Sequence, residues 1–273
     1  MIKKEDIIRN TLIQEIVRID MFKIMDISNI LKTIDPIMKE YGFEFSSNDV
    51  YDVNISINDP QELITQKFIT NVNKTTNYQY IKDDEKFVLN EFMIFFQKSK
   101  FQGYKNIDRY LELFTKIMEK IIDNEKVSIK RIGIRKINRI IGKNLDVISK
   151  VFKDDDINLE EVNQYQGYKN DRKKILQDAN KNSMNVFKSI DKGIGIYKEE
   201  EIPMYSTTLD IDAYCRNFRE DINIEEIRNK MIELSEAVYN QFISYENEIL
   251  LRVLTDKNEI EDLEIYGGVN NID

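Results

Sequence analysis

The chain has 273 residues, of which 41% are hydrophobic, and a formal net charge of −9. This length can bury a substantial core, whereas the negative charge disfavours general affinity for nucleic acid or anionic membranes, which the field of the protein would repel. Histidine is absent and Cys215 is the single cysteine, so the composition excludes an intramolecular disulfide and leaves almost no ligands for structural zinc.

The first half of the chain is predicted to contain strands and two helices. A helix over about 28–41 ends at Gly42, and a second helix over 106–122 carries an apolar stripe at spacings of three and four. Between them the sequence predicts four strands, at 51–57, 63–72, 76–82 and 86–96, with a turn at 83–85. The run 86–96 is apolar on both faces, so we expect it at the centre of a covered sheet.

The second half is predicted to begin with a polar surface excursion over 154–182. Strands follow over 184–215. They comprise a hairpin with its turn at Asp191–Gly193 and a further strand from Met204 to Cys215.

The carboxyl-terminal region is predicted to be helical. Apolar residues repeat at spacings of three and four over 224–254, and Asn223 with Glu226 forms the expected cap. We expect this long helix to break near Ser244 and the acidic end, 256–273, to fray.

These elements predict an α+β fold in which mostly antiparallel sheet packs against long amphipathic helices. In each of two segments, 1–143 and 144–273, strands precede a long helix. Two similar halves from an internal duplication are one interpretation, and a common α+β element order is the other. The amino-terminal residues are charged, and no apolar run reaches the roughly 18 residues of a membrane span. We therefore expect a cytoplasmic protein without a membrane partner.

The strand predicted over 127–141 is the most unusual segment of the chain. Residues 126–143 hold seven basic residues and no acidic residue, although acids outnumber bases 49 to 40 in the whole chain. Because side chains alternate along a strand, Arg131, Arg135 and Arg139 share one face, and an isoleucine-rich face with Asn138 lies opposite. Guanidinium groups bind phosphate or carboxylate bidentately. The candidates for an anion or partner site are therefore Arg131, Arg135, Arg139 and Lys136.

A second strand offers an internal counterpart to these arginines. In Leu209–Tyr214, the polar side chains Asp210, Asp212 and Tyr214 alternate with apolar residues and share one face. If the two strands face one polar interior, the aspartates neutralise the arginines without any ligand. Structural pairing is thus the favoured interpretation, and an anion or nucleic-acid contact and a partner-protein contact are the alternatives.

The segment Gly133–Arg139 also resembles the Gly-Leu-Arg-Tyr-Ile-Asn-Arg signature of an uncharacterised, sporadically distributed prokaryotic family. The strand Leu209–Tyr214 and the helical segment Ala237–Phe242 agree with that family in order and spacing. Lys136 replaces the usual tyrosine, and the histidine often found in the last helix is missing. The resemblance implies a mobile or anti-phage defence locus, and it implies no particular activity.

No catalytic constellation, metal site or cofactor motif emerges from the residues. We therefore expect a non-enzymatic cytosolic binding or accessory protein whose arginine strand is structural or binds an anion. Its partner would be another protein or an anionic ligand. The alternative is a metal-dependent enzyme acting on nucleic acid or nucleotides, in which Asp210 and Asp212 would hold the metal beside the arginines.

Overall fold

A ten-stranded antiparallel sheet forms the body of the protein. The computed structural model describes residues 7–24, 26–56, 69–99, 108–124, 128–152, 161–162, 165–166, 169–216, 218, 222–256 and 262–271. The strands of the sheet are β2 (Leu12–Met21), β3 (Glu44–Ser56), β4 (Ile69–Lys82), β5 (Glu85–Leu89), β6 (Met93–Ser99), β7 (Ile129–Gly142), β10 (Lys169–Gln177), β11 (Ser183–Tyr197), β12 (Glu200–Arg216) and β13 (Ile265–Gly267). Two short pairs lie outside it, β1 (Arg9–Asn10) with β14 (Asn270–Asn271) and β8 (Glu161–Val162) with β9 (Tyr165–Gln166).

The strands follow the same kind of path on both sides of the centre of the sheet. β2 and β7 pair with each other at the centre. β6, β5, β4 and β3 follow outward from β2, and β12, β11 and β10 follow outward from β7. In each series the chain passes from the central strand to the outermost strand and then returns strand by strand. One sheet therefore includes strands from both predicted segments, 1–143 and 144–273, and their origin as two similar halves stays a prediction.

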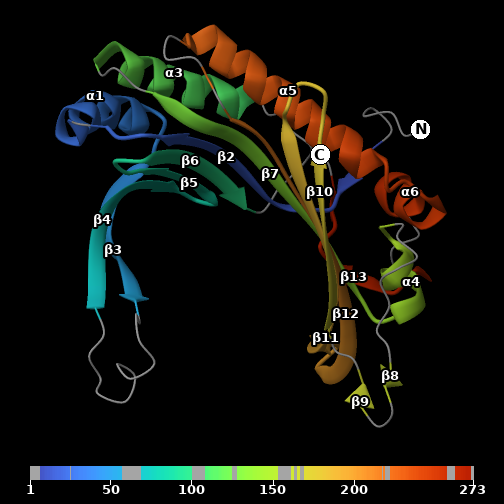
Figure 1. Cartoon of the computed structure of the whole chain (residues 1–273). Coiled ribbons are helices and arrows are strands. Elements are labelled where there is room, and N and C mark those ends of the chain that lie inside the picture. Colours follow the sequence, from blue (N-terminus) through green and yellow to red (C-terminus); the bar gives the residue numbers. More distant parts are fainter. Residues whose placement is uncertain are drawn as a thin grey trace.

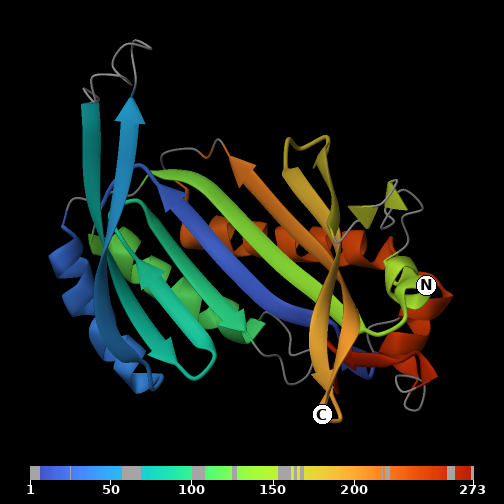
Figure 2. The same ribbon diagram turned by 90° about the horizontal axis from the view of Figure 1, so that it is seen from below.

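Helices cover one face of the sheet. They are α1 (Ile27–Glu40), α3 (Asp108–Asn124), α4 (Leu145–Lys150), α5 (Ile224–Ile243) and α6 (Glu248–Thr255). Figure 1 shows α1, α3 and α5 over the convex face of the arched sheet, with β3–β4 and β11–β12 extending downward at its two ends. Seen from below, the concave face has no described helix over it (Figure 2). No helix in the described part of the chain is long and apolar enough to cross a membrane.

The core lies between the sheet and the helices. α5 contributes one buried stripe, formed by Ile227, Met231, Leu234, Val238 and Phe242. Asn223 and Glu226 form the predicted capping box at the start of α5, which ends at Ile243 with Ser244 as its C-cap, so the predicted break near Ser244 is confirmed. The chain then continues as the separate helix α6.

The prediction of one strand over 86–96 is wrong, because this segment folds as the β5–β6 hairpin. Asn90 makes the turn: its Oδ1 accepts hydrogen bonds from the backbone N–H groups of Phe92 (2.8 Å) and Met93 (2.9 Å). Its Nδ2 donates to Asn77 Oδ1 on β4 at 2.8 Å. A single polar side chain thus satisfies a tight turn inside an apolar run, so the hydrophobic pattern did not reveal it.

The predicted turn at Asp191–Gly193 is also wrong. β11 continues to Tyr197 and pairs with β12 over its whole length. The turn lies at Lys198 and Glu199, whose φ angles of 50° and 69° suit a two-residue hairpin. Gly195 instead allows close packing, since a Cβ there would lie 2.6 Å from Met204 Cγ.

Part of the polar excursion predicted over 154–182 is regular structure, because β10 is the edge strand beside β11. The acidic end is likewise partly ordered, since β13 pairs with β7 and β14 pairs with β1. Most of the strand predicted over 63–72 lies outside the described residues. Helices α1 and α3 and strand β7 lie where the sequence predicted them, whereas β4 is unbroken from Ile69 to Lys82, so the predicted gap between the strands at 63–72 and 76–82 is wrong.

Candidate ligand groove on the concave face

The two faces of β7 differ as the sequence predicted. Ile132, Ile134 and Ile140 are buried on the face that the helices cover. Arg131, Arg135 and Arg139 alternate with them, so all three arginines lie on the concave face. The guanidinium groups therefore face the one side of the sheet that no described helix covers.

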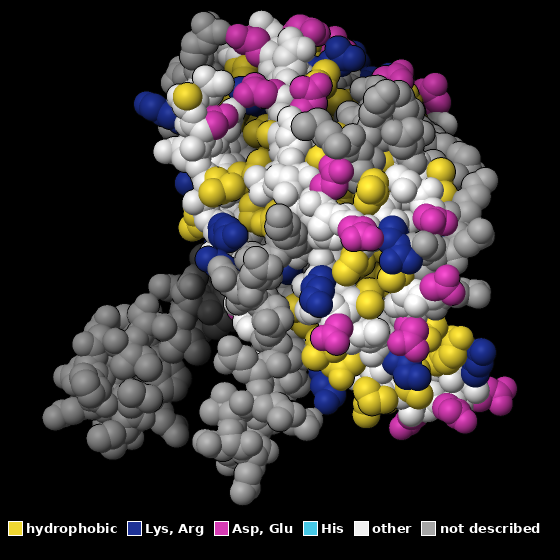
Figure 3. Space-filling view, turned by 90° about the vertical axis from the view of Figure 1, so that its right-hand side faces the viewer, with side chains coloured by type: hydrophobic (Ala, Val, Ile, Leu, Met, Phe, Trp, Pro, Cys, Tyr) yellow, Lys and Arg dark blue, Asp and Glu magenta, His cyan; other side chains and the backbone are white. Residues whose placement is uncertain are grey.

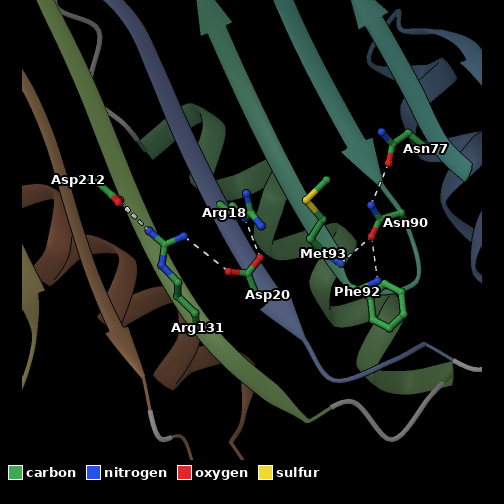
Figure 4. Close-up of polar contacts among 8 residues, drawn as sticks. All are labelled: Arg18, Asp20, Asn77, Asn90, Phe92, Met93, Arg131 and Asp212. Carbon is green, nitrogen blue, oxygen red and sulfur yellow. Dashed lines mark hydrogen bonds and ion pairs between the residues drawn. The ribbon is translucent and has the colours of Figure 1, made fainter. Parts of the chain in front are cut away.

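Two of the three arginines form ion pairs with the predicted aspartates of β12. The terminal nitrogen NH2 of Arg131 lies 2.9 Å from both carboxylate oxygens of Asp212, and its NH1 lies 3.6 Å from Asp20 (Figure 4). Arg135 binds Asp210 bidentately at 2.8 and 2.5 Å. This pair raises the pKa of Arg135 through the hydrogen bond to Asp210. The charges of these two arginines are thus neutralised within the fold.

Arg139 differs from the other two arginines. Its side chain is exposed, and its Nε donates to Thr208 Oγ1 at 3.2 Å. Within the described ranges it has no carboxylate partner. Tyr214, the third polar residue predicted on β12, lies under Arg131, with 4.7 Å between the guanidinium carbon and the ring centroid. Internal pairing is therefore observed for Arg131 and Arg135, whereas no carboxylate among the described residues neutralises Arg139.

Lys136 and Asn138 lie on the opposite face of β7. Lys136 is 9% exposed, and its Nζ lies 3.3 Å from Glu15 Oε1 and 3.3 Å from Ser235 Oγ on α5. Asn138 is also buried and accepts a hydrogen bond from Thr11 at 3.0 Å. Lys136 was a candidate anion ligand, but it alternates with the three arginines along β7, so its side chain lies on the opposite face, beneath α5. Neither residue lines the concave face.

A groove of about 640 Å³ lies on the concave face beside the arginine strand. Its charged lining residues are Arg18, Asp20 and Lys130. The other lining residues are Met21, Phe22, Val50, Thr75, Asn77, Asn90, Phe92 and Met93. Figure 4 shows Arg18 bonded to Asp20 on β2, near the Asn77–Asn90 pair and the ring of Phe92. Sequence reasoning missed this groove, because its residues come from β2, β3, β4, β7 and the β5–β6 turn.

Backbone hydrogen bonds hold the two phenylalanines of the groove in place. The N–H of Met21 donates to the carbonyl of Phe92 at 2.7 Å, and the N–H of Phe22 donates to Ser128 at 3.1 Å. Asn90 fixes the turn that carries Phe92 by the contacts described above. The sequence contained only local signals for this site: Lys130 belongs to the basic segment 126–143, and Phe92 follows the polar residues Asn90 and Glu91.

No protein-family model matches the chain, and no curated protein matches it either. The described residues contain no group of three or more cysteine or acidic side chains that could hold a metal ion. Asp210 and Asp212, the carboxylates of the predicted metal alternative, each bind an arginine.

Cys215 is expected to react slowly with thiol reagents. It is buried on the helix-covered face of β12, and burial raises its pKa to about 11. The thiolate is the reactive form, so little of it exists near pH 8 in the folded protein. Labelling with a disulfide reagent such as DTNB should be slow in buffer and complete in denaturant, where the thiol returns to a pKa of about 8.5. Fast labelling of the native protein would show that the thiol is accessible.

Proposed function

We propose that the protein is a binding module that holds a small anionic ligand in the concave groove. The observation that supports this most directly is the pair of cations in the lining. Arg18 donates to Asp20 from Nε at 2.7 Å, so its two terminal nitrogens remain able to donate. Lys130 is exposed and forms no ion pair with a residue in the described ranges. Two cations and one carboxylate thus line a groove in a chain whose net charge is −9.

The size of the groove and the charge of the protein both favour a small ligand over a polymer. Pockets for small molecules commonly measure about 300–1,000 Å³, and the groove is within that range. Figure 3 shows basic and acidic side chains interspersed among the described residues at the end of the molecule that faces the viewer, and these described side chains form no broad field of one sign. A long polyanion would need such a field, because its affinity depends on many cationic contacts.

The setting of this module is a further part of the proposal. The resemblance of Gly133–Arg139 to a sporadically distributed prokaryotic family supports an accessory or sensor role in a mobile or anti-phage defence locus. Such a role needs ligand binding and no catalytic group. Detection of the ligand would then be the task of the concave face.

Replacing Lys130 or Arg18 with glutamine is expected to weaken phosphate binding about tenfold or more, since a hydrogen bond to a charged group contributes about 1.5–3 kcal/mol. Titration of the protein with inorganic phosphate, followed by amide NMR shifts, measures the dissociation constant. The shifts should centre on the groove residues. Each variant removes a cation without removing a buried side chain, so the melting temperature should change little.

Arg139→Gln provides the matched control, because Arg139 is an exposed arginine on the same face but outside the groove. It should leave phosphate binding unchanged. If Arg139→Gln abolished binding while Lys130→Gln did not, the anion site would lie at the arginine strand and the groove would be the wrong location. Absence of any phosphate shift would contradict the proposed function.

A further inference from the structure

We infer that the ligand of the groove carries an aromatic ring, which stacks on Phe92 and Phe22 while its anionic group contacts Arg18 and Lys130. This inference rests on the proposed function. The inference adds the class of ligand to the proposed function: a small anion whose aromatic ring is close to its charged group. Free nucleotides and aromatic carboxylates share this chemistry.

Exposed hydrophobic side chains gather in this groove. Phe22 is 64% exposed, Phe92 45% and Val50 43%. The described part of the chain has ten large hydrophobic residues that are exposed, and these three all line the groove. Single exposed hydrophobic residues are common on protein surfaces, whereas a group of them beside charged residues marks a binding site.

The rings cannot easily turn away from solvent by a backbone movement. Three backbone hydrogen bonds tie the segment after β2 to its neighbours: Met21 to Phe92, Phe22 to Ser128, and Ile24 to Glu91 at 2.8 Å. The amide of Asn90 adds three more contacts around the turn, and Asn90 is itself buried. Because these hydrogen bonds already fix the backbone that carries the rings, the site loses little conformational entropy when a ligand binds.

Strand pairing places the cations next to the rings. Met21 pairs with Ile129 and Asp20 pairs with Arg131, so Lys130 is the extra residue between these two pairs. It lies two residues along the chain from Ser128, to whose carbonyl the N–H of Phe22 donates. Asp20, which holds Arg18, pairs with Met93 in the strand that follows Phe92. Neighbouring strands are about 4.8 Å apart, so charge and ring surface lie within roughly one or two strand spacings. A ligand that uses both needs its anionic group close to its ring.

The polar part of the lining favours a ring that carries hydrogen-bond acceptors. Asn77 Oδ1 accepts from Asn90 at 2.8 Å, which leaves the Nδ2 donors of Asn77 available. Thr75, also in the lining, supplies a hydroxyl group. A nucleobase presents acceptors at its edge and a flat face for stacking on phenylalanine. Among the two sources, a mononucleotide therefore uses more of the groove than an aromatic carboxylate does.

The test compares four anions on the same protein: inorganic phosphate, ribose 5-phosphate, adenosine monophosphate and N-acetylphenylalanine. Amide NMR titration gives a dissociation constant for each. At least one of the two aromatic anions should bind about 5- to 150-fold more tightly than phosphate, which is the range expected for one stacked ring. Tighter binding than phosphate by adenosine monophosphate alone would identify a nucleobase as the ring. Tighter binding than phosphate by both aromatic anions would identify a site for aromatic rings in general.

Phe92→Ala should remove this advantage, so that the aromatic anions bind the variant no more tightly than phosphate binds the same variant. Phe45→Ala is the matched control, because Phe45 on β3 is 49% exposed and lies outside the groove lining. An aromatic advantage that survived both Phe92→Ala and Phe22→Ala would overturn the inference. So would equal affinity for all four anions, which would leave the anion site itself intact. Failure of every anion to bind would instead contradict the proposed function, and the inference with it.

Discussion

Replacing Lys136 with methionine is expected to lower the free energy of unfolding by about 3–5 kcal/mol, the usual loss when one partner of a buried ion pair is removed. Lys136 Nζ lies 3.3 Å from Glu15 Oε1 at the centre of the sheet, and both residues are almost fully buried. Methionine keeps the length of the side chain, so the loss reports the carboxylate that remains buried without its cation. Denaturation by guanidinium chloride, followed by circular dichroism, measures the change.

The double variant Lys136→Met with Glu15→Leu tests the cause of this loss. Removing both charges should recover most of the stability, because an apolar pair of similar volume can replace a buried ion pair at little cost. A double variant as unstable as Lys136→Met would show that packing around Lys136, and not the unpaired charge, determines the result. A loss below about 1 kcal/mol in the single variant would place Glu15 in contact with solvent.

The sequence was sufficient to predict the arginine strand and its counterpart because both show strict alternation. Alternation assigns each residue to a face of its own strand, so it grouped Arg131 with Arg135 and Asp210 with Asp212. The pairing of β7 with β12 is what places the two groups on one face of the sheet. Lys136 has the same parity as the buried isoleucines, so this rule alone places it in the core. Lys136 was predicted as an anion candidate because of its charge, although its position in the strand places it on the buried face.

Alternation could not predict which arginine meets which aspartate. In the sheet, Asp212 is directly opposite Arg135, yet it binds Arg131, and Asp210 binds Arg135. Asp210 is offset from Arg135 by two residues, the ordinary diagonal neighbour, whereas Asp212 is offset from Arg131 by four, so the Arg131 side chain extends along the sheet past Gly133. Register depends on the whole sheet, so single-strand patterns do not contain it.

The groove was unpredictable for a related reason. Arg18 with Phe22, then Phe92, then Lys130 come from three distant parts of the sequence, and they meet because β2 lies between β6 and β7. The turn that holds Phe92 interrupts an apolar run that appeared to be one strand. The order of strands in a sheet is a tertiary property, and no local pattern in this chain specified it.

Replacing Gly268 with alanine is expected to lower the free energy of unfolding by about 3 kcal/mol or more, through strain and displacement of the carboxyl-terminal strands. Gly268 has φ +75°, and a Cβ there would lie 1.9 Å from the carbonyl oxygen of Arg139. That oxygen belongs to the backbone of the central strand β7, so no change of side-chain rotamer can relieve the clash. β13 and β14 should lose their pairing, which hydrogen exchange of their amides would detect.

Gly267→Ala is the matched control for this variant. Its Cβ would meet only the side chain of Ile141 at 3.5 Å, an ordinary contact. Gly267 is not among the glycines with positive φ, so alanine adds no backbone strain there. This neighbouring variant should therefore stay close to the original stability, and amide exchange in β13 should stay slow. Equal stability of the two variants would contradict the close approach of Gly268 to β7, and with it the attachment of the carboxyl-terminal strands to the sheet.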